Sequence, residues 1–432
     1  MHILILGGGA AGLALAGLID NSKHRVVVLE QDSPEEFAKK WNWYDNLNVA
    51  ELRRLGYAEV LPDSFPEQGE RTVASPSGKF KLRFKIERPL SYEPVARQRL
   101  LSGLREKARE KAGLRYDAKA ESLLVEDGRV AGVLLPDGRE IRADLTIDCT
   151  GATELSRPLL GDLFRTETET VTVFRGIFPH EQIDAAPAID NVVLKPLGIP
   201  GVSRYSINAS DKTDVYIGCV GSANGDRAAK ILEELLKEHS PWDKPDINAG
   251  TWGKYKIPAR CPLPQFVFDG YALLGDSACM SALHVGSGIV NALHGAKILA
   301  DLVNKDGGTD ISTLWSYQVR YYRETAKSDW RVDVFNRWLL EIPDEVLESM
   351  FSSRILTPDD AERVFTGRFI SFAPKNILHK GAQLILHPRL LFSIIGVFVR
   401  SIWVEECRRS IPEQYDAKRV AVWQQRLARA ME

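Results

Sequence analysis

The sequence of 432 residues predicts an α/β fold with an inserted antiparallel β-sheet and a helical C-terminal region. Three observations predict this fold. An apolar strand runs into a glycine-rich turn and an apolar helix near residue 1, short alternating strands fill the middle of the chain, and helical patterns fill its last third. A chain of this length can bury cores for about two to three domains.

The N-terminal segment predicts a dinucleotide-binding unit. An apolar strand at residues 2–6 (HILIL) leads directly into the turn GGGAAG, and an apolar helix follows. A second, β-branched strand (RVVVLE) ends in Glu30, whose carboxylate would accept hydrogen bonds from an adenosine ribose. This is the G-x-G-x-x-G fingerprint with strand, turn, helix and acidic residue all in place. The fingerprint alone leaves NAD and FAD both open as ligands.

Each small residue of the turn has a mechanical task. Gly7 permits the tight turn, Gly9 lets the backbone approach a diphosphate, and Gly12 lets the helix pack close to its strand. Ala10 and Ala11 follow at the start of the helix, where free N–H groups and the helix dipole favour an anion.

The middle of the chain does not continue as regular βαβ units. A tryptophan-rich stretch (KWNWYDNLN) follows the second strand, and RTVASPSGKFKLRFKI predicts a β-hairpin. A helix with an apolar stripe and then a β-meander follow, and the meander ends in an apolar strand at 145–147 and a turn at 148–151. Residues 164–253 are strand-rich again, which predicts a largely antiparallel sheet that can cover a pocket.

The predicted organisation follows from these patterns. The chain enters a Rossmann-like nucleotide-binding domain twice. The first entry comprises residues 1–91, with the hairpin as an excursion, and residues 92–163; the second comprises residues 254–305. The antiparallel-sheet substrate domain spans 164–253, and the helical region spans 306–432.

A second motif follows the apolar residues 271–274. Gly275 and Asp276 come at the end of this strand, and a Gly-Ser-Gly sequence at 286–288 begins a helix. Glycines at a helix start expose N–H donors, and the positive partial charge there stabilises an electron-rich or anionic cofactor.

These motifs, in this order, resemble a flavoprotein family that includes aromatic hydroxylases and geranylgeranyl reductases. The motifs are GGGAAG with Glu30, R-x-x-L at 97–100, the D-x-x-G turn at 148–151 with Arg157 after it, and GDSACMSALHVGSGI. The segment IPARCPLPQFVFDGYALLGDSACM is more similar to the geranylgeranyl reductases, and the resemblance spans residues 1–300. It implies an FAD-dependent oxidoreductase, and it selects FAD over NAD.

The resemblance also implies the contacts with FAD. Arg97 would lie near the diphosphate, Asp276 would bind the ribityl chain, and the backbone at 286–289 would meet the flavin ring. The full implied set is Gly7, Gly9, Ala10, Ala11, Gly12, Glu30, Arg97, Gly275, Asp276, Gly286, Ser287, Gly288 and Ile289. The chain departs from the family at Leu283, where a proline is usual, and at KWNWYDNLN, so the exact substrate stays open.

Three residues are candidates for the chemistry. His284 could donate a proton near neutral pH, with a structural loop histidine as the alternative. Cys279 lies in the same loop and could touch the flavin, or it could be a buried, inert cysteine. Tyr205 could bind substrate or pack within its sheet.

Trp41 and Trp43 are candidates for the substrate pocket, with packed surface aromatics as the alternative. The pair superficially resembles the W-x-W of flavin-dependent halogenases. That match fails because Tyr44 and Asp45 stand where Ile-Pro is expected, and because the motif lies too near the N-terminus.

The leading hypothesis is reduction of carbon–carbon double bonds in an isoprenoid, geranylgeranyl-type lipid by hydride from reduced flavin. The enzymatic alternative is a flavin monooxygenase that hydroxylates a small ring with O₂ and NAD(P)H, and an electron-carrying flavoprotein is the non-enzymatic one. Because the chain has only one dinucleotide fingerprint, its electrons must come from NAD(P)H, a ferredoxin-like protein or another soluble donor.

Composition excludes other classes of partner. With 56 basic and 58 acidic side chains, and no basic stripe with interleaved aromatics, nucleic acid is not expected as a partner. Five cysteines without CxxC spacing favour a reducing, cytoplasmic compartment and argue against a zinc site. Residues 382–403 are the most apolar stretch, for which a core helix, a dimer contact and peripheral membrane contact all stay open.

Overall fold

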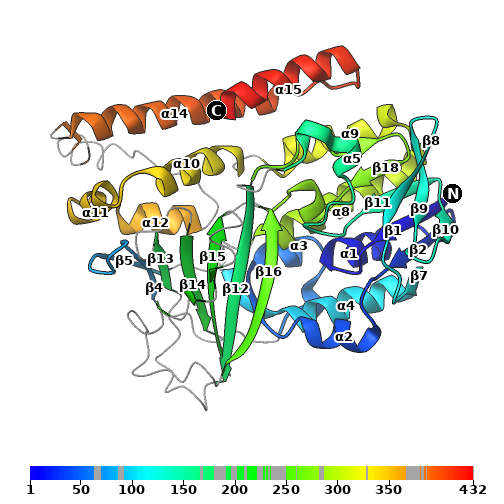
Figure 1. The fold of residues 1–432 in the computed structure, drawn as a ribbon, viewed down its shortest axis with the longest axis horizontal. Coiled ribbons are helices and arrows are strands. Elements are labelled where there is room, and N and C mark those ends of the chain that lie inside the picture. The colour runs from blue at the N-terminus through cyan, green and yellow to red at the C-terminus, as the bar shows by residue number, and fades with distance from the viewer. Residues whose placement is uncertain are drawn as a thin grey trace.

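The structure is a computed structural model of the chain (Figure 1). The residues that it describes are 1–62, 70–85, 92–165, 169–179, 191–195, 202–208, 212–220, 227–228, 230–231, 234, 250–258, 260–281, 287–326, 329–365, 380, 384–385 and 387–431.

A six-stranded, mainly parallel sheet forms the core of the nucleotide-binding part, with the strand order β17-β18-β11-β1-β2-β7. Five of its strands run parallel, and the short edge strand β17 is antiparallel. The strands are β1 (His2–Leu6), β2 (Arg25–Leu29), β7 (Ala112–Arg115), β11 (Leu145–Asp148), β17 (Val267–Phe268) and β18 (Tyr271–Leu273).

Both faces of this sheet are covered, which explains why β1 is almost continuously apolar. Ile3 and Ile5 face a core shared with three helices, α1 (Ala10–Leu18), α4 (Arg97–Arg109) and α8 (Ser287–Asp306). Leu4 and Leu6 point to the other face and pack with the predicted meander. That meander is a separate three-stranded sheet of β8 (Ser122–Glu126), β9 (Arg129–Leu134) and β10 (Glu140–Arg142).

A seven-stranded sheet stands beside this core (Figure 1), in the order β16-β12-β15-β14-β13-β4-β5. All neighbours are antiparallel except β13 and β4. The predicted hairpin forms, and it extends this sheet at one edge. The strands are β4 (Arg71–Ala74), β5 (Lys81–Phe84), β12 (Thr170–Pro179), β13 (Asn191–Leu194), β14 (Val202–Asn208), β15 (Lys212–Val220) and β16 (Thr251–Pro258).

Short elements connect the two sheets. The tryptophan-rich stretch leads into β3 (Tyr44–Asn48), which pairs with β6 (Tyr92–Ala96) as a two-stranded ribbon. The remaining short elements are α2 (Pro34–Lys40), α3 (Val49–Arg54), η1 (Ala58–Val60), α5 (Arg157–Leu160), η2 (Gly161–Leu163) and η7 (Gly275–Ala278).

Helices dominate the described residues after 310. Figure 1 shows α14 and α15 as an outer layer above α9 and α10. The helices are α9 (Ile311–Glu324), α10 (Asp329–Glu341), α11 (Asp344–Ser352), α12 (Pro358–Phe365), α14 (Pro388–Arg409) and α15 (Ala417–Met431). Among the helices of the described residues, none combines the length and the apolarity that crossing a membrane requires. The prediction of a mixed α/β fold with a parallel sheet is confirmed.

Candidate functional site

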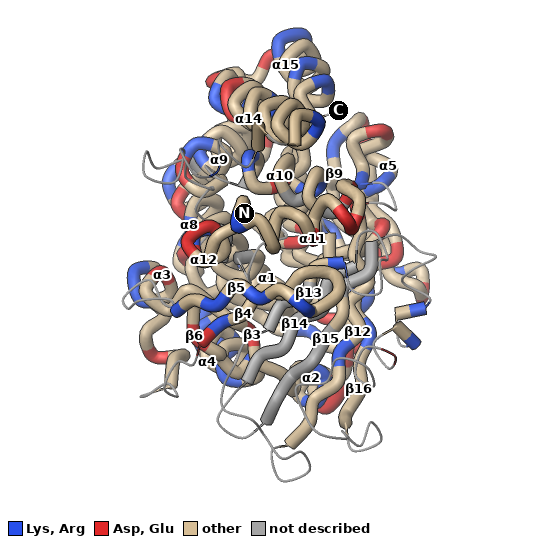
Figure 2. The backbone as a smooth tube through the Cα atoms, turned by 90° about the vertical axis from the view of Figure 1, so that its left-hand side faces the viewer, with Lys and Arg blue, Asp and Glu red and all other residues tan. Residues whose placement is uncertain are grey.

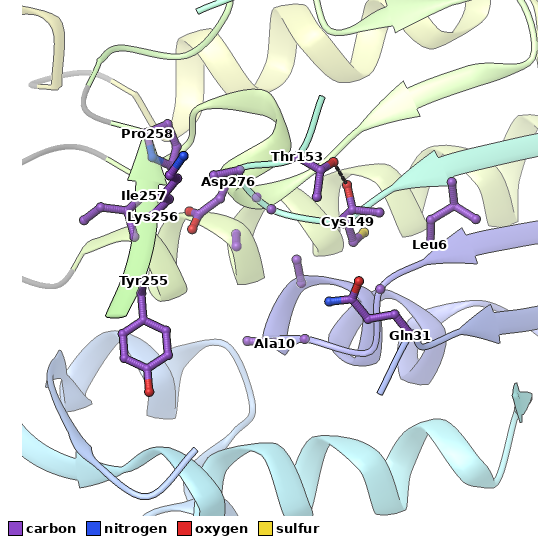
Figure 3. A pocket seen from close by; sticks show the side chains of 18 of the residues that line it. Leu6, Ala10, Gln31, Cys149, Thr153, Tyr255, Lys256, Ile257, Pro258 and Asp276 are labelled. Carbon is purple, nitrogen blue, oxygen red and sulfur yellow. Dashed lines mark hydrogen bonds between the residues drawn. The ribbon is translucent and has the colours of Figure 1, made fainter. Parts of the chain in front are cut away.

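A cavity of about 910 Å³ opens where four parallel strands end at their carboxyl sides. The segments that follow β1, β2, β11 and β18 all contribute to its wall, as expected for ligand sites in open α/β sheets. Figure 3 shows the side chains of Tyr255–Pro258 on one side, Leu6, Gln31 and Cys149 on the other, and Asp276 between them. The predicted residues that line the cavity are Gly7, Gly9, Ala10, Ala11, Glu30, Trp41, Trp43, Arg97, Gly275, Asp276, Gly288 and Ile289.

The glycines of the first turn differ in what surrounds them. Gly7 has φ +99°, and a Cβ there would lie 2.5 Å from the carbonyl oxygen of Cys149, so no other residue fits. A Cβ on Gly12 would lie 2.1 Å from the carbonyl oxygen of Gly7, which explains the close packing of α1; Gly12 is not among the cavity-lining residues. Around Gly9 no atom lies within 4 Å of the Cβ position, so this backbone faces open space.

The start of α1 fits an anionic diphosphate. Gly9 is its N-cap, and no side chain caps the helix, so the N–H groups of the first turn are left for a ligand. Glu30 stabilises the turn, because its carboxylate accepts hydrogen bonds from the N–H groups of Gly8 at 2.7 Å and Asp32 at 2.9 Å. Glu30 is buried yet lines the cavity, which fits the predicted contact with a ribose.

The tryptophan-rich stretch forms a cationic and aromatic wall of this cavity. Asp45 accepts two hydrogen bonds from Arg97, one from Nε and one from Nη2 at 2.9 Å. The guanidinium of Arg97 lies 5.4 Å from the ring centroid of Trp41 and 5.5 Å from that of Trp43. Arg175, from β12, lies 4.5 Å from the centroid of the Trp43 ring and donates to the carbonyl of Tyr44 at 3.3 Å. Trp41 and Trp43 therefore line the cavity, and their assignment to a substrate pocket stays a prediction.

One further observation at this wall fits a bound ligand. The indole N–H groups of Trp41 and Trp43 are buried and have no hydrogen-bond partner in the described part of the chain. Burial raises the pKa of Asp276, although the nearby Arg97 cation and a hydrogen bond with Ser281 oppose this effect.

The second motif meets the first through its glycines. Gly275 has φ +76°, and a Cβ there would lie 3.0 Å from the Cβ of Ala11, so η7 approaches the start of α1 closely. A Cβ on Gly288 would lie 3.0 Å from the Cβ of Ser281 and 3.8 Å from Oδ1 of Asp276. The carboxylate of Asp276 and the start of α8 thus lie side by side at the cavity.

The turn after β11 belongs to the site, although the sequence motif alone did not assign its residues to the cofactor contacts. Asp148 is fully buried and accepts hydrogen bonds from Thr150, through N–H at 2.9 Å and Oγ1 at 2.7 Å, and from the Tyr271 hydroxyl at 2.7 Å. Burial raises the pKa of Asp148. The carboxyl shapes a turn whose residues Cys149 and Gly151 line the cavity. The position of this D-x-x-G turn at a strand end was the available signal.

Asp45 and Arg175 were also missed by sequence reasoning. Asp45 is 52 residues from Arg97, and Arg175 is 131 residues from its acceptor Tyr44. No local pattern joins such pairs.

The predicted catalytic residues have different outcomes. Cys279 is completely buried, is not among the cavity-lining residues, and has a pKa that burial raises to about 12. This fits the alternative of a buried, inert cysteine. Tyr205 lies in β14, where it pairs with Tyr216 and Val192, and its side chain is outside the described part. His284 and Gly286 lie outside the described residues, as does the side chain of Ser287 at the start of α8.

No metal site emerges from the part of the chain that the structure describes. Its His, Cys, Asp and Glu residues form no group of three or more that could hold a metal ion.

Comparison with known proteins gives the same fold and related sequences. Residues 2–185 match the model of the lycopene cyclase protein family. The chain is 24% identical over 193 residues to a digeranylgeranylglycerophospholipid reductase of Methanococcoides burtonii, covering 44% of this chain and 43% of that protein. The corresponding reductase of Sulfolobus acidocaldarius is 21% identical over 160 residues, which is 36% of this chain and 35% of that protein. The matched part spans less than half the length of these curated relatives.

The similarity to solved structures extends over most of the chain. A geranylgeranyl bacteriochlorophyll reductase-like protein of Thermoplasma acidophilum superposes with a TM-score of 0.70 at 17% identity, covering 92% of this chain and 98% of that one. The flavin-dependent brominase Bmp2 gives 0.59 at 15% identity, over 90% of this chain and 100% of that one. A probable FAD-dependent monooxygenase of Pseudomonas aeruginosa gives 0.52 at 20% identity, over 85% and 99%.

These similarities confirm the predicted resemblance to the FAD-dependent oxidoreductases that include the geranylgeranyl reductases. The names of these similar proteins, which include reductases, a flavin-dependent brominase and an FAD-dependent halogenase, agree with the predicted FAD cofactor and oxidoreductase class. The fold is shared by reductases, halogenases and monooxygenases, so the reaction has to be argued from the site.

Proposed function

We propose that this protein is an FAD-dependent reductase of carbon–carbon double bonds in an isoprenoid, geranylgeranyl-type lipid. The observation that carries the proposal is the continuity of one cavity. It runs from the fingerprint turn and Glu30, past Asp276 and Gly288, to the apolar side chains of β12 and β16. The names of the curated reductases, which act on digeranylgeranylglycerophospholipids, support the substrate class.

In this proposal one end of the cavity holds the cofactor. The uncapped start of α1 binds the diphosphate, Glu30 binds the ribose, and Arg97, held by Asp45, adds a positive charge near the diphosphate. Asp276 binds the ribityl chain, and the backbone at the start of α8, at Gly288 and Ile289, meets the flavin ring. Strands from residues 2–29 and 112–148, which are separated by the hairpin excursion, lie in one sheet with strands from residues 267–273. This arrangement supports an FAD domain that the chain enters twice.

The other end of the cavity takes the substrate. Apolar side chains from the seven-stranded sheet, among them Val171, Val173, Ile257 and Pro258, line it, and an isoprenoid tail offers only apolar contacts in return. Trp43 and Tyr255, whose ring centroids are 4.5 Å apart, both line the cavity and join the wall around Arg97 to the seven-stranded sheet.

The chemistry is that of the cofactor, and the chain positions the reactants. When bound and reduced, FAD would supply a hydride to one alkene carbon while a proton reaches the other carbon, so that the double bond gains two hydrogens. His284 is the proposed source of that proton, because an imidazole can donate near neutral pH. NAD(P)H or a ferredoxin-like protein would reduce the cofactor again.

The monooxygenase alternative makes opposite predictions about oxygen. We propose to incubate the chemically reduced holoenzyme without air with a digeranylgeranyl lipid and to analyse the extract by mass spectrometry. The reductase proposal expects products that have gained two hydrogens per double bond. A protein that leaves the lipid unchanged, but consumes O₂ and NAD(P)H when a small aromatic compound is added, would be the monooxygenase instead.

A further inference from the structure

The outer helix α14 has two apolar faces, of which only one is used within the molecule. Its inner face packs on α10 and α15 through Ile394, Val397, Val404 and other buried residues. On the outer face, Phe392 is 72% exposed and Val399 is 62% exposed. The exposed apolar residues Phe392, Ile395, Val399, Ile402 and Trp403 recur at helical spacing, and we call them the α14 stripe.

The helix is firmly anchored, so the exposure of the stripe is a property of the folded protein. Trp338 of α10 donates a hydrogen bond to Ser393 at 2.7 Å, and Trp423 of α15 donates to the carbonyl of Cys407 at 2.7 Å. Arg408 is buried and donates to the carbonyl of Tyr322 on α9. Contiguous exposed apolar surface of this kind marks an interaction site.

The charges beside the stripe indicate what covers it. Arg400 lies exposed within the stripe, and α15, which packs against α14, carries four exposed basic residues and no acidic one. Figure 2 shows these basic residues of α15 at the outer edge of the molecule. The four residues are Lys418, Arg419, Arg426 and Arg429, whereas the whole chain has a net charge of −2.

We propose that α14 and α15 dock this protein on an anionic lipid surface. Apolar side chains beside Lys and Arg are the pattern of a helix that lies in the membrane interface, where the apolar face enters the acyl boundary and the cations meet the headgroups. Trp403, at one end of the stripe, suits the interface because its ring is apolar and its N–H is polar. A second copy of the chain fits less well, because a symmetric pairing through this patch would bring the same basic residues together.

This inference does not depend on the proposed reaction, since binding is measured without turnover. The test is sedimentation of the full-length holoprotein with vesicles of phosphatidylcholine alone and of phosphatidylcholine with phosphatidylglycerol. We expect binding to the anionic vesicles, and a loss of affinity on the order of a hundredfold for the triple variant Phe392→Ser, Ile395→Ser, Val399→Ser, because three apolar side chains no longer enter the lipid. Phe80→Ser is the matched control, because Phe80 is an exposed apolar residue on the β4–β5 hairpin, and its binding should equal that of the wild type.

Two more variants test the two parts of the surface separately. Replacing Lys418, Arg419 and Arg426 by Gln should weaken binding to the anionic vesicles about fivefold per charge, with no change on neutral ones. Anionic vesicles should shift tryptophan emission to the blue, and Trp403→Phe should remove part of this shift.

Three outcomes would overturn the proposal. The wild type could fail to bind anionic vesicles, or the triple variant, shown to be folded by its melting temperature, could bind them as the wild type does. The third is a wild-type dimer that becomes a monomer in the triple variant while neither protein binds vesicles, which would assign the stripe to a second copy of the chain.

Discussion

Asp45 and Arg97, which are 52 residues apart in the sequence, form a two-point ion pair at the wall of the cavity. Asp45 comes from the ribbon strand β3 and Arg97 from the start of α4, so the pair joins two elements beside the fingerprint turn. The indole rings of Trp41 and Trp43 lie against the same guanidinium. Together these side chains hold the guanidinium of Arg97 at a fixed place where an anionic cofactor would bind.

The first prediction concerns this charge. Arg97→Gln should raise the Kd for FAD about tenfold to a hundredfold, since a charge-assisted hydrogen bond contributes roughly 1.5–3 kcal/mol. Titration of apoprotein with FAD, followed by flavin fluorescence, measures the change. Arg99→Gln is the control in the same helix, because Arg99 donates to the carbonyls of Val60 and Leu61 and does not line the cavity. Equal FAD affinities of the two variants would remove Arg97 from the cofactor site.

The second prediction separates two glycines of the turn. Gly7→Ala should destabilise the protein by roughly 1–3 kcal/mol or more, because the left-handed backbone is strained and the methyl meets the Cys149 carbonyl. Gly9→Ala should leave the melting temperature of the apoprotein nearly unchanged, because nothing lies within 4 Å of the new methyl.

Gly9→Ala should nevertheless lose FAD, because the methyl occupies the space that the diphosphate needs. Comparing melting curves with and without added FAD tests both variants. A Gly9→Ala protein that FAD stabilises as strongly as the wild type would contradict the assignment of the diphosphate to this turn.

The third prediction concerns pH. Burial raises the pKa of Asp148 above its ordinary value of 3.8, so the folded state holds this proton more tightly than the unfolded state. Its contribution to stability is therefore fully present below the unfolded pKa and is lost as the pH rises through the folded pKa. Asp148→Asn has no such proton. The stability of the wild type relative to this variant should fall as the pH rises from the ordinary aspartate range, as measured by urea unfolding across pH. A difference that stays constant with pH would contradict the burial argument.

The fourth prediction distinguishes the two candidates that follow Gly275 in the sequence, Cys279 and His284. Cys279→Ala should retain alkene reduction within about twofold and lose only stability, because its thiol is buried and its pKa is raised to about 12. His284→Gln should slow the reaction about a hundredfold or more if the imidazole supplies the proton. Single-turnover rates with pre-reduced flavin give the comparison. An inactive Cys279→Ala protein that is as stable as the wild type would overturn the structural role of this cysteine.

Sequence patterns predicted the parts of the site that are contiguous in the chain. The turn at 7–12 with Glu30, and the Gly275-Asp276 motif, each carry their signal within one strand, turn and helix. The Asp45–Arg97 pair and the contact of Arg175 with Trp43 depend on how distant strands are placed, which no local periodicity encodes.

The fold shows the same difference between features set by local patterns and features set by contacts between distant residues. The parallel core followed from strand and helix patterns, and the hairpin at 71–84 was predicted as such. Its membership of the seven-stranded sheet, through parallel pairing of β4 with β13, depends on residues more than a hundred positions away. Likewise, the apolar stretch 382–403 left three roles open, because only tertiary packing shows which face of α14 is buried.

Anaerobic turnover of a lipid substrate tests the proposed reduction on one sample. The holoenzyme, reduced chemically without air, is mixed with a digeranylgeranyl lipid, and the molecular mass of the extracted lipid is measured by mass spectrometry. We expect lipid that has gained two hydrogens for each double bond reduced, with the flavin reoxidised in equal amount. Unchanged lipid beside flavin that stays reduced, in a protein that demonstrably holds FAD, would contradict it.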